Sequence, residues 1–311
     1  MDAVKAKFNS NGFAILESFY SPEEVDSVLG DIEMMLAEKP SQIVVDNLET
    51  RERTSLALVD LEDMKRSRMK VNDLYLEQES VRRLALSEKL APVLENLLGE
   101  TPVLCNSLYM AKGSEQRHHV DAIYMTPRSD DHLIAAWIAL EDAHPDAGQL
   151  VYYPGSHQLP QWTFSNGTRH FVEDEMDAWR AHMASLVHEA GMPRMQFSAK
   201  KGDVFVWHSN LLHGGGKIED PTLTRKSLVF HYFSLPDAVA LNIDRVSMNG
   251  AFWMKRPHLP LHEDVLRKLP FSENAYLARY EDVAAAVEAG AFDSGRDHYE
   301  RFGKHEGRLP V

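Results

Sequence analysis

From residue 103 onward the chain consists of short apolar runs separated by turn signals, and this feature limits its fold most strongly. The runs are rich in β-branched and aromatic residues. They lie at 103–112, 133–141, 149–153, 204–207 and 227–233. No regular alternation of strand and helix separates them, so a parallel sheet built from βαβ units is not expected. The pattern predicts an antiparallel double sheet with helices outside it.

The first hundred residues are mainly helical in pattern. A short apolar strand is expected at 12–16. Ser21, followed three residues later by Glu24, forms a capping box that predicts the start of a helix. A second helix is predicted over 81–98, whereas residues 40–65 are polar and poorly periodic and are expected to form a loop.

Charge and cysteine content exclude several classes of partner and site. The formal net charge is −14, which argues against nucleic acids and anionic membranes as partners. Cys105 is the only cysteine, so an intrachain disulfide and a thiolate metal site are both excluded. The N-terminus lacks a signal-peptide pattern, and the longest apolar run, 133–140, is far shorter than the ~20 residues that span a bilayer. A cytoplasmic protein is expected.

Three His-x-Asp sequences stand in different contexts, namely His119-Asp121, His144-Asp146 and His262-Asp264. The second lies in a polar turn. The third opens a helix, where side chains two residues apart point about 200° apart and cannot chelate one ion. The first lies between two extended segments, and on a strand two such side chains share a face. His119 and Asp121 are therefore the predicted metal-ligand pair.

A third ligand is predicted downstream at His213. Two imidazoles and one carboxylate on one face of an ion leave open positions, which is the ligand set of mononuclear Fe(II) oxygenases. His208 is a rival ligand, but the glycines at 214–216 leave room for a ligand to approach His213. His119, Asp121 and His213 are thus the candidate catalytic metal triad.

With these ligands in place, residues 106–233 resemble the phytanoyl-CoA dioxygenase family of Fe(II)/2-oxoglutarate-dependent oxygenases. The resemblance is carried by the ligand pair, by Gln116 and Trp137 at their spacing from it, and by the segments 148–157, 202–214, 11–13 and 21–24. It implies a double-stranded β-helix, or jelly roll, with Fe(II) at one mouth. It also implies 2-oxoglutarate and O2 as cosubstrates, and hydroxylation of an aliphatic carbon of a small organic substrate with release of succinate and CO2.

Arg225 is the predicted anchor of the cosubstrate. A dicarboxylate needs a permanently charged, fork-shaped donor, and a buried arginine is costly unless it is paired. The alternative is an ion pair with one of the 47 acidic residues. In the family, an arginine at this position binds 2-oxoglutarate. Ser227 and His231 share its strand face: Ser227 is expected to assist the carboxylate, and His231 either lines the pocket or fills the core.

Further site residues follow from the resemblance. Asn106 falls on a family cosubstrate position, and Lys70 lies in a short segment similar to another. Trp137 matches a family pocket position, although a tryptophan in such a run is also an ordinary core residue. Gln116 and Tyr124 flank the ligand pair and either face the substrate or lie in a solvated loop.

Two segments stand apart from the predicted sheets. Residues 164–190 form a partly helical insertion that is either a lid over the site or a surface excursion. Residues 271–311 resemble a small helical module found at the ends of bacterial glycosyltransferases and sulfotransferases. We therefore expect an oxygenase domain at 1–256, a linker at 257–270 and a module at 271–311. The module is expected to mediate docking or homo-oligomerisation, or to act only as a passive cap on the jelly roll.

Two other classes of function remain open at this stage. A cupin-like isomerase or hydrolase would use the same His/Asp/His set without 2-oxoglutarate, and Arg225 and Asn106 would then lack a common purpose. A non-catalytic metal-binding protein on the same scaffold is the other alternative, against which the intact triad argues.

Overall fold

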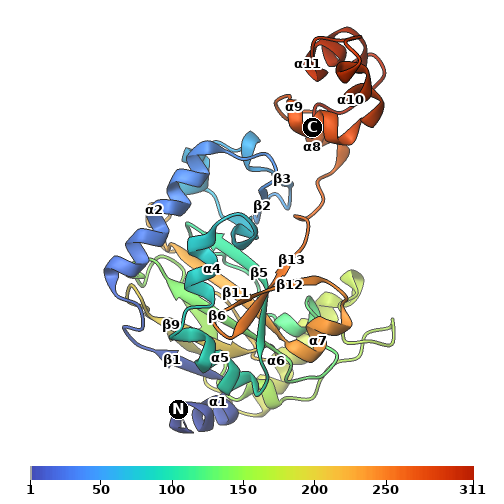
Figure 1. The fold of residues 1–311 in the computed structure, drawn as a ribbon. Helices are drawn as coiled ribbons and strands as arrows, with labels where there is room; N and C mark the ends of the chain where they lie inside the picture. The colour runs from blue at the N-terminus through green and yellow to red at the C-terminus, as the bar shows by residue number, and fades with distance from the viewer. Residues whose placement is uncertain (1) are drawn as a thin grey trace.

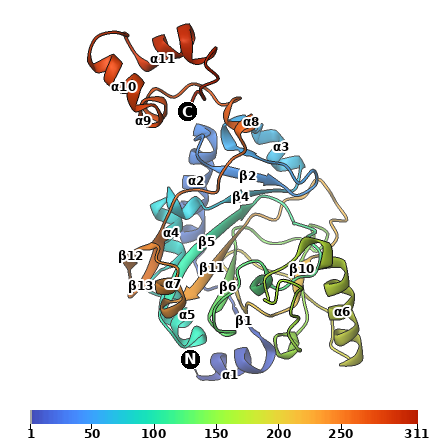
Figure 2. The ribbon, with the colours of Figure 1, turned by 90° about the vertical axis from the view of Figure 1, so that its right-hand side faces the viewer.

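The structure is a computed structural model that describes residues 2–311. Two mainly antiparallel sheets face each other, and helices flank them (Figures 1 and 2). The strands are β1 (Phe13–Leu16), β2 (Val44–Asn47), β3 (Arg53–Ser55), β4 (Met69–Asn72), β5 (Pro102–Met110), β6 (Leu133–Ala139), β7 (Leu150–Tyr152), β8 (Met195–Phe197), β9 (Val204–His208), β10 (His213–Gly215), β11 (Ser227–Ser234), β12 (Asp244–Met248) and β13 (Ala251–Lys255). The helices are α1 (Asp2–Asn11), α2 (Pro22–Glu38), α3 (Leu61–Arg66), α4 (Glu79–Ala85), α5 (Leu90–Leu98), α6 (Met176–Glu189), α7 (Leu235–Ala240), α8 (Glu263–Leu266), α9 (Glu273–Arg279), α10 (Glu281–Glu288) and α11 (Gly295–His298).

The large sheet has the order β1-β9-β6-β11-β5-β4-β2-β3, and the small sheet has the order β10-β7-β8. Strand β6 shows why these residues form a sheet that is covered on both faces. Ile134 and Ile138 belong to the core between the large sheet and the helices α2, α4 and α5. Trp137, which points the opposite way because successive strand residues alternate, belongs to the core between the two sheets. The metal-ligand candidates lie in that second, inter-sheet layer.

The predicted strands at 12–16, 103–112, 133–141, 149–153, 204–207 and 227–233 are confirmed within a few residues at their ends. The capping box is confirmed as well: the Ser21 hydroxyl accepts a bond from the Glu24 amide at 3.3 Å, and the Glu24 carboxylate accepts one from the Ser21 amide. It starts α2, whose buried face includes Val25 and Ile32.

Two predictions in the N-terminal third are wrong. Residues 81–98 form two helices, α4 and α5, because the Ser87 hydroxyl accepts a bond from the Leu90 amide and so starts a second helix. Residues 40–65 are not a loop, since β2 and β3 form a hairpin there and α3 follows. Strand β4 pairs with β2 on one side and with β5 on the other, and so joins this hairpin to the large sheet.

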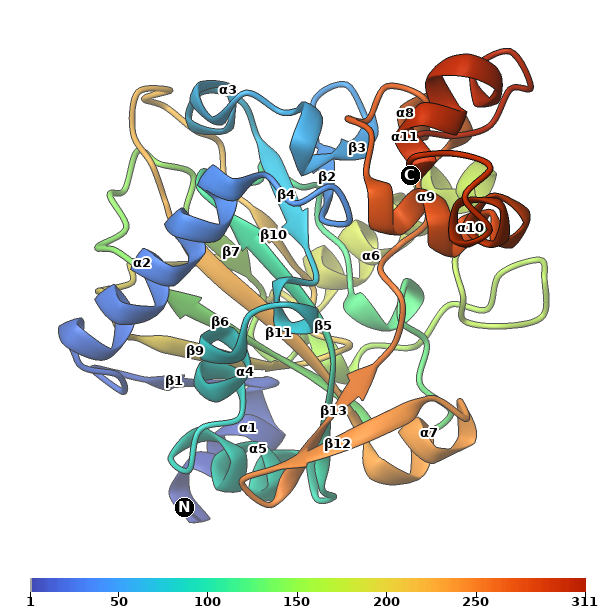
Figure 3. The same ribbon diagram turned by 45° about the horizontal axis from the view of Figure 1, so that its top comes forward.

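The C-terminal residues fold upon themselves. Figure 3 shows an extended segment that leaves β13 and leads to α9, α10 and α11, which lie away from the large sheet. The Ser272 amide donates to the Pro310 carbonyl at 3.0 Å, and the Tyr276 hydroxyl hydrogen-bonds to His298 inside this group of helices. The predicted connector also contains a short helix, α8. No helix among residues 2–311 has the length and apolar character to cross a membrane.

Candidate metal centre

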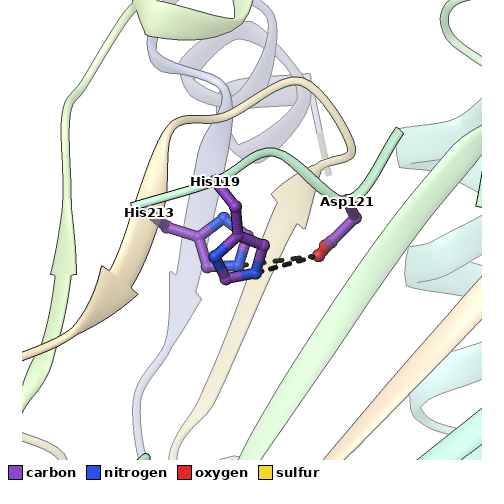
Figure 4. A group of neighbouring side chains, drawn as sticks. All are labelled: His119, Asp121 and His213. Atoms are coloured by element: carbon purple, nitrogen blue, oxygen red, sulfur yellow. Dashed lines mark ion pairs between the residues drawn. The ribbon is translucent and has the colours of Figure 1, made fainter. Parts of the chain in front are cut away.

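The two histidines of the predicted triad are fixed to each other by their backbones. The His119 amide donates to the His213 carbonyl at 2.8 Å, and the His213 amide donates to the His119 carbonyl at 3.0 Å. Residues that exchange both bonds lie directly opposite each other and place their side chains on the same face. Their ring centroids are accordingly 4.3 Å apart (Figure 4).

Hydrogen bonds to two backbone carbonyls show which ring nitrogen of each imidazole carries a proton. Nδ1 of His119 lies 2.9 Å from the Arg117 carbonyl, and Nδ1 of His213 lies 2.9 Å from the Leu211 carbonyl. A carbonyl only accepts, so each Nδ1 carries the proton and each Nε2 offers its lone pair. This arrangement is typical of histidines that bind a metal through Nε2.

Asp121 completes the group from the turn that follows His119. Its Oδ1 lies 3.6 Å from Nε2 of His119 and 3.7 Å from Nε2 of His213, and the ligand atoms of the three residues lie within 4.8 Å of one another. Its other oxygen, Oδ2, accepts a bond from the indole N–H of Trp207 at 2.8 Å. One carboxylate oxygen thus faces the imidazoles while the other is held by the protein.

The expectation that His119 and Asp121 share one strand is wrong in its local geometry. His119 forms an isolated bridge to His213, and a 3-10 turn, Asp121–Ile123, follows directly. Residues 122–126 are not a strand. The turn still carries the Asp121 side chain toward the imidazoles, so the two ligands converge by a bend of the chain rather than by strand alternation.

Burial and charge keep these groups in the forms that bind cations. Burial, with a contribution from His213, lowers the pKa of His119 to about 3, so its imidazole is neutral near pH 7. Burial alone would raise the pKa of Asp121, but the nearby imidazoles of His213 and His231 outweigh it and hold the pKa below its ordinary value. A neutral imidazole at His119 beside the ionised carboxylate of Asp121 suits a divalent transition metal.

The competing histidine motifs lie elsewhere. His208 points to the outer side of β9, where Nε2 lies 3.0 Å from the Asp131 carboxylate and Nδ1 accepts the Asn210 amide. His144 and Asp146 are exposed, and His262 caps α8 as predicted. Within residues 2–311, only His119, Asp121 and His213 form a group of this kind.

Arg225 lines the same small cavity of about 60 Å³ as the triad. It is 3% exposed, and burial lowers the pKa of its guanidinium to about 10. The guanidinium donates to the Gly148 carbonyl and lies 5.6 Å from the Trp137 ring centroid. It forms no ion pair within residues 2–311, so the expected alternative, a structural salt bridge, is not found there.

Unpartnered polar atoms gather around this arginine. Nε of Arg225, Nε1 of Trp137 and Oγ of Ser227 are all buried and make no hydrogen bond with the described residues. Buried donors normally have partners, so three such donors on and beside the neighbouring strands β6 and β11 indicate a site for an acceptor. A buried cation without a counter-charge indicates that this acceptor is an anion.

The other predicted site residues are distributed around the cavity. Lys70 lines it, and its ammonium lies 3.3 Å from an Asp46 carboxylate oxygen. Gln116 is exposed and lines it too, while Tyr124 is 37% exposed and its ring centroid lies 5.7 Å from that of His119. His231 is buried and also lines the cavity.

Asn106 is placed on the same sheet face, directly opposite His231 on β11. Its amide nitrogen donates to Asp73 at 3.0 Å, and its carbonyl oxygen lies 3.0 Å from Nδ1 of His231. Its contact with a cosubstrate stays a prediction, because both polar groups already have protein partners.

Helix α6, in the predicted insertion, packs against the residues next to the metal ligands. Met176, Trp179, Met183 and Val187 are buried on one face of α6. They belong to one cluster with Val120 and Leu212, the chain neighbours of the ligands. Figure 2 shows α6 beside β10, on the side away from α2 and α4.

Sequence reasoning missed Trp207, Asp73 and Arg256. Trp207 lies inside a motif that was recognised, and its alternation with outward-facing neighbours on β9 could have placed its indole N–H in the inter-sheet layer. Asp73 and Arg256 lie far apart in the sequence, and no local pattern connects them.

The fold and the site together define a mainly antiparallel two-sheet protein with a buried two-histidine, one-carboxylate group. The chain matches the phytanoyl-CoA dioxygenase (PhyH) family over residues 8–225 and belongs to that family. It is 24% identical over 246 residues to the mouse (Mus musculus) peroxisomal phytanoyl-CoA dioxygenase, covering 73% of this chain and 66% of that protein. The chain thus spans about two thirds of that relative.

Solved structures of similar fold include the epimerase SnoN in complex with Fe3+, α-ketoglutarate and nogalamycin RO. Its TM-score is 0.55 at 21% identity, covering 85% of this chain and 96% of that one. EctD from S. alaskensis with bound Fe has a TM-score of 0.56 at 19% identity, covering 76% of this chain and 78% of that one.

Proposed function

We propose that this protein is an Fe(II)- and 2-oxoglutarate-dependent dioxygenase that hydroxylates an aliphatic carbon of a small organic molecule, releasing succinate and CO2. The observation that carries the proposal is the unpaired, buried Arg225 in the same cavity as the triad. A metal group alone would also suit an isomerase or a hydrolase. A buried guanidinium with no counter-charge calls for an anionic ligand as well, and 2-oxoglutarate supplies a carboxylate at each end.

The proposal assigns a role to the ligand residues and to the polar residues in or beside the cavity. His119, Asp121 and His213 hold the ferrous ion, which supplies the activation of O2 when it is bound. Arg225 binds the far carboxylate of 2-oxoglutarate, and Ser227 and Trp137 donate their free hydrogens to it. Lys70 adds positive charge at the edge of the cavity.

The remaining residues control the surroundings of the reaction. Apolar side chains on β5, β7 and β11 line the cavity and exclude water, which strengthens the attraction between Arg225 and a carboxylate; they are Leu108, Met110, Leu150 and Val229. Gln116, Tyr124 and His231 are proposed to contact the substrate. The two sheets with the metal at one end are proposed to be a double-stranded β-helix.

Decarboxylation of 2-oxoglutarate tests the proposal. Protein supplied with Fe(II) is expected to release CO2 from 1-¹⁴C-labelled 2-oxoglutarate even without substrate, and a chelator should stop the release. Zn²⁺ in place of Fe(II) is the matched control, because it binds similar ligands without redox chemistry. A metal-loaded protein that neither binds nor decarboxylates 2-oxoglutarate would favour the isomerase or hydrolase alternative.

The class of oxidation needs a separate readout, because a solved neighbour of this fold is named an epimerase. A mass-spectrometric search over candidate metabolites is expected to find a product heavier by one oxygen atom, about 16 Da. A product of unchanged mass, formed with consumption of 2-oxoglutarate, would indicate epimerisation instead.

We further propose that residues 1–256 form the oxygenase domain, 257–270 the linker and 271–311 a separate module for docking or homo-oligomerisation. Removing residues 271–311 is expected to lower the oligomeric mass measured by light scattering, and to leave 2-oxoglutarate decarboxylation within about twofold, because none of these residues lines the metal cavity. An unchanged mass at full activity would leave only the role of a passive cap.

A further inference from the structure

A chain of polar side chains, of which Asp73 and His231 are buried and Asn106 and Arg256 partly buried, runs from the end of β13 to the triad. The Arg256 guanidinium donates to Oδ2 of Asp73 at 2.9 Å, and Oδ1 of Asp73 accepts the Asn106 amide at 3.0 Å. The Asn106 carbonyl oxygen lies 3.0 Å from Nδ1 of His231, whose Nε2 lies 3.5 Å from Oδ2 of Asp121. None of the contacts before His231 involves a metal ligand.

The direction of each hydrogen bond in this chain is fixed by the one before it. The Asp73 carboxylate is paired with a guanidinium and only accepts, so Asn106 must turn its NH2 group toward it. The Asn106 oxygen then faces His231 and accepts from Nδ1. The ring of His231 is thereby held with Nε2 directed at Asp121 and the cavity.

Arg256 orients the first group of this hydrogen-bonded chain, the Asp73 carboxylate. Asp73 is fully buried, and Arg256 is its only cationic partner within residues 2–311. Burial alone would lower the pKa of Arg256, but the charge of Asp73 outweighs it and raises the pKa above the ordinary value. The same guanidinium donates to the Cys105 carbonyl at 3.0 Å, which fixes it to β5 next to Asn106.

We propose that Arg256, which lies beyond the matched family region, is a positioning residue of the metal centre that acts through Asp73 and Asn106 to fix the orientation of the His231 ring against Asp121. Residues that orient a metal ligand from outside commonly change metal affinity about 10- to 100-fold. The inference rests on the proposed function only in that the triad binds Fe(II).

Anaerobic calorimetric titration with Fe(II) tests the proposal in the full-length protein. Arg256→Met is expected to raise the Kd for Fe(II) at least about tenfold. Arg245→Met is the matched control: Arg245 lies on the neighbouring strand β12, and its guanidinium donates to the backbone carbonyls of Ala238 and Ile243. Its Kd for Fe(II) should stay within twofold of that of the wild type.

A second measurement separates positioning from a general loss of structure. Long-range ¹H–¹⁵N spectra of protein labelled at histidine, with His231→Gln to assign the signal, report which ring nitrogen of His231 carries the proton. The wild type is expected to show a protonated Nδ1, held in its hydrogen bond to Asn106, whereas the Arg256→Met spectrum should show that this hydrogen bond is lost in part of the molecules. If Arg256→Met does not fold, the double variant Arg256→Met with Asp73→Asn removes both charges of the pair and is expected to fold, yet to show the same loss of order at His231.

The outcomes are distinct. Wild-type protein that does not bind Fe(II) would refute the proposed function itself. Wild-type protein that binds Fe(II), together with a folded Arg256 variant of equal affinity and unchanged His231 signal, would overturn the positioning role alone.

Discussion

Replacing His213 by alanine is expected to abolish Fe(II) binding at micromolar concentrations and 2-oxoglutarate turnover with it. Loss of partners outside the ligand set already costs about 10- to 100-fold in metal affinity, and loss of a ligand should cost more. His213 also shares its backbone bridge with His119, and that bridge survives the substitution because alanine keeps the same amide and carbonyl. The effect should therefore arise from the missing imidazole rather than from a displaced strand.

His208→Ala is the matched control for this experiment. His208 is a buried histidine of the same sequence motif, but its imidazole binds Asp131 on the outer side of β9. Its removal should leave the Kd for Fe(II) within about threefold, with only a moderate loss of thermal stability. If His208→Ala abolished metal binding and His213→Ala did not, the ligand assignment would be wrong.

The central strands of the large sheet could be predicted from the sequence because they are buried on both faces, whereas β8, β10, β12 and β13 were not predicted. The runs that form β5, β6, β9 and β11 consist almost wholly of apolar and aromatic residues, and such runs are bounded by clear turn signals. The hairpin of β2 and β3 was missed for the opposite reason. Its strands are short and partly exposed, so they lack an alternating pattern, and they are strands only because β4 joins them to the large sheet.

The break between α4 and α5 shows a second limit. Residues 81–98 carry a continuous apolar pattern, and nothing in that pattern marks a stop. The break depends on Ser87, whose hydroxyl binds the Leu90 amide and also the Tyr20 hydroxyl at 2.8 Å. The cap acts within one turn, but its serine is also held by a contact across 67 positions, which the apolar pattern does not show.

The candidate metal site was predictable in its members but not in its local geometry. His-x-Asp and a later histidine identify three ligands, yet they do not reveal that Asp121 reaches the site through a 3-10 turn. The residues that hydrogen-bond around the ligands were even harder to predict from the sequence. Trp207, Asp73 and Arg256 act by contacts between distant elements, and only the folded chain brings these elements together.

Arg225→Met is expected to have opposite effects on cosubstrate binding and on the stability of the ligand-free protein. The substitution removes a buried cation that has no counter-charge among residues 2–311, and so relieves a desolvation cost. The lost bond between the guanidinium and the Gly148 carbonyl costs about 1.5–3 kcal/mol, which this relief offsets. The ligand-free variant should therefore unfold at an unchanged or higher temperature than the wild type.

Binding of 2-oxoglutarate should change in the other direction. A buried, charge-assisted carboxylate contact is worth roughly 2–5 kcal/mol, which corresponds to an increase of roughly 30- to 4,000-fold in Kd or KM. The pKa of Arg225, about 10, leaves the guanidinium charged between pH 7 and 8, so the wild-type affinity should not vary over that interval through this group.

Thermal unfolding with and without 2-oxoglutarate measures both effects in one experiment, because a ligand raises the melting temperature only if it binds the folded state. Arg225→Lys, which keeps the charge without the fork, should give an intermediate affinity. A methionine variant that is strongly destabilised when ligand-free, yet still stabilised by 2-oxoglutarate like the wild type, would show that Arg225 supports the fold rather than the cosubstrate.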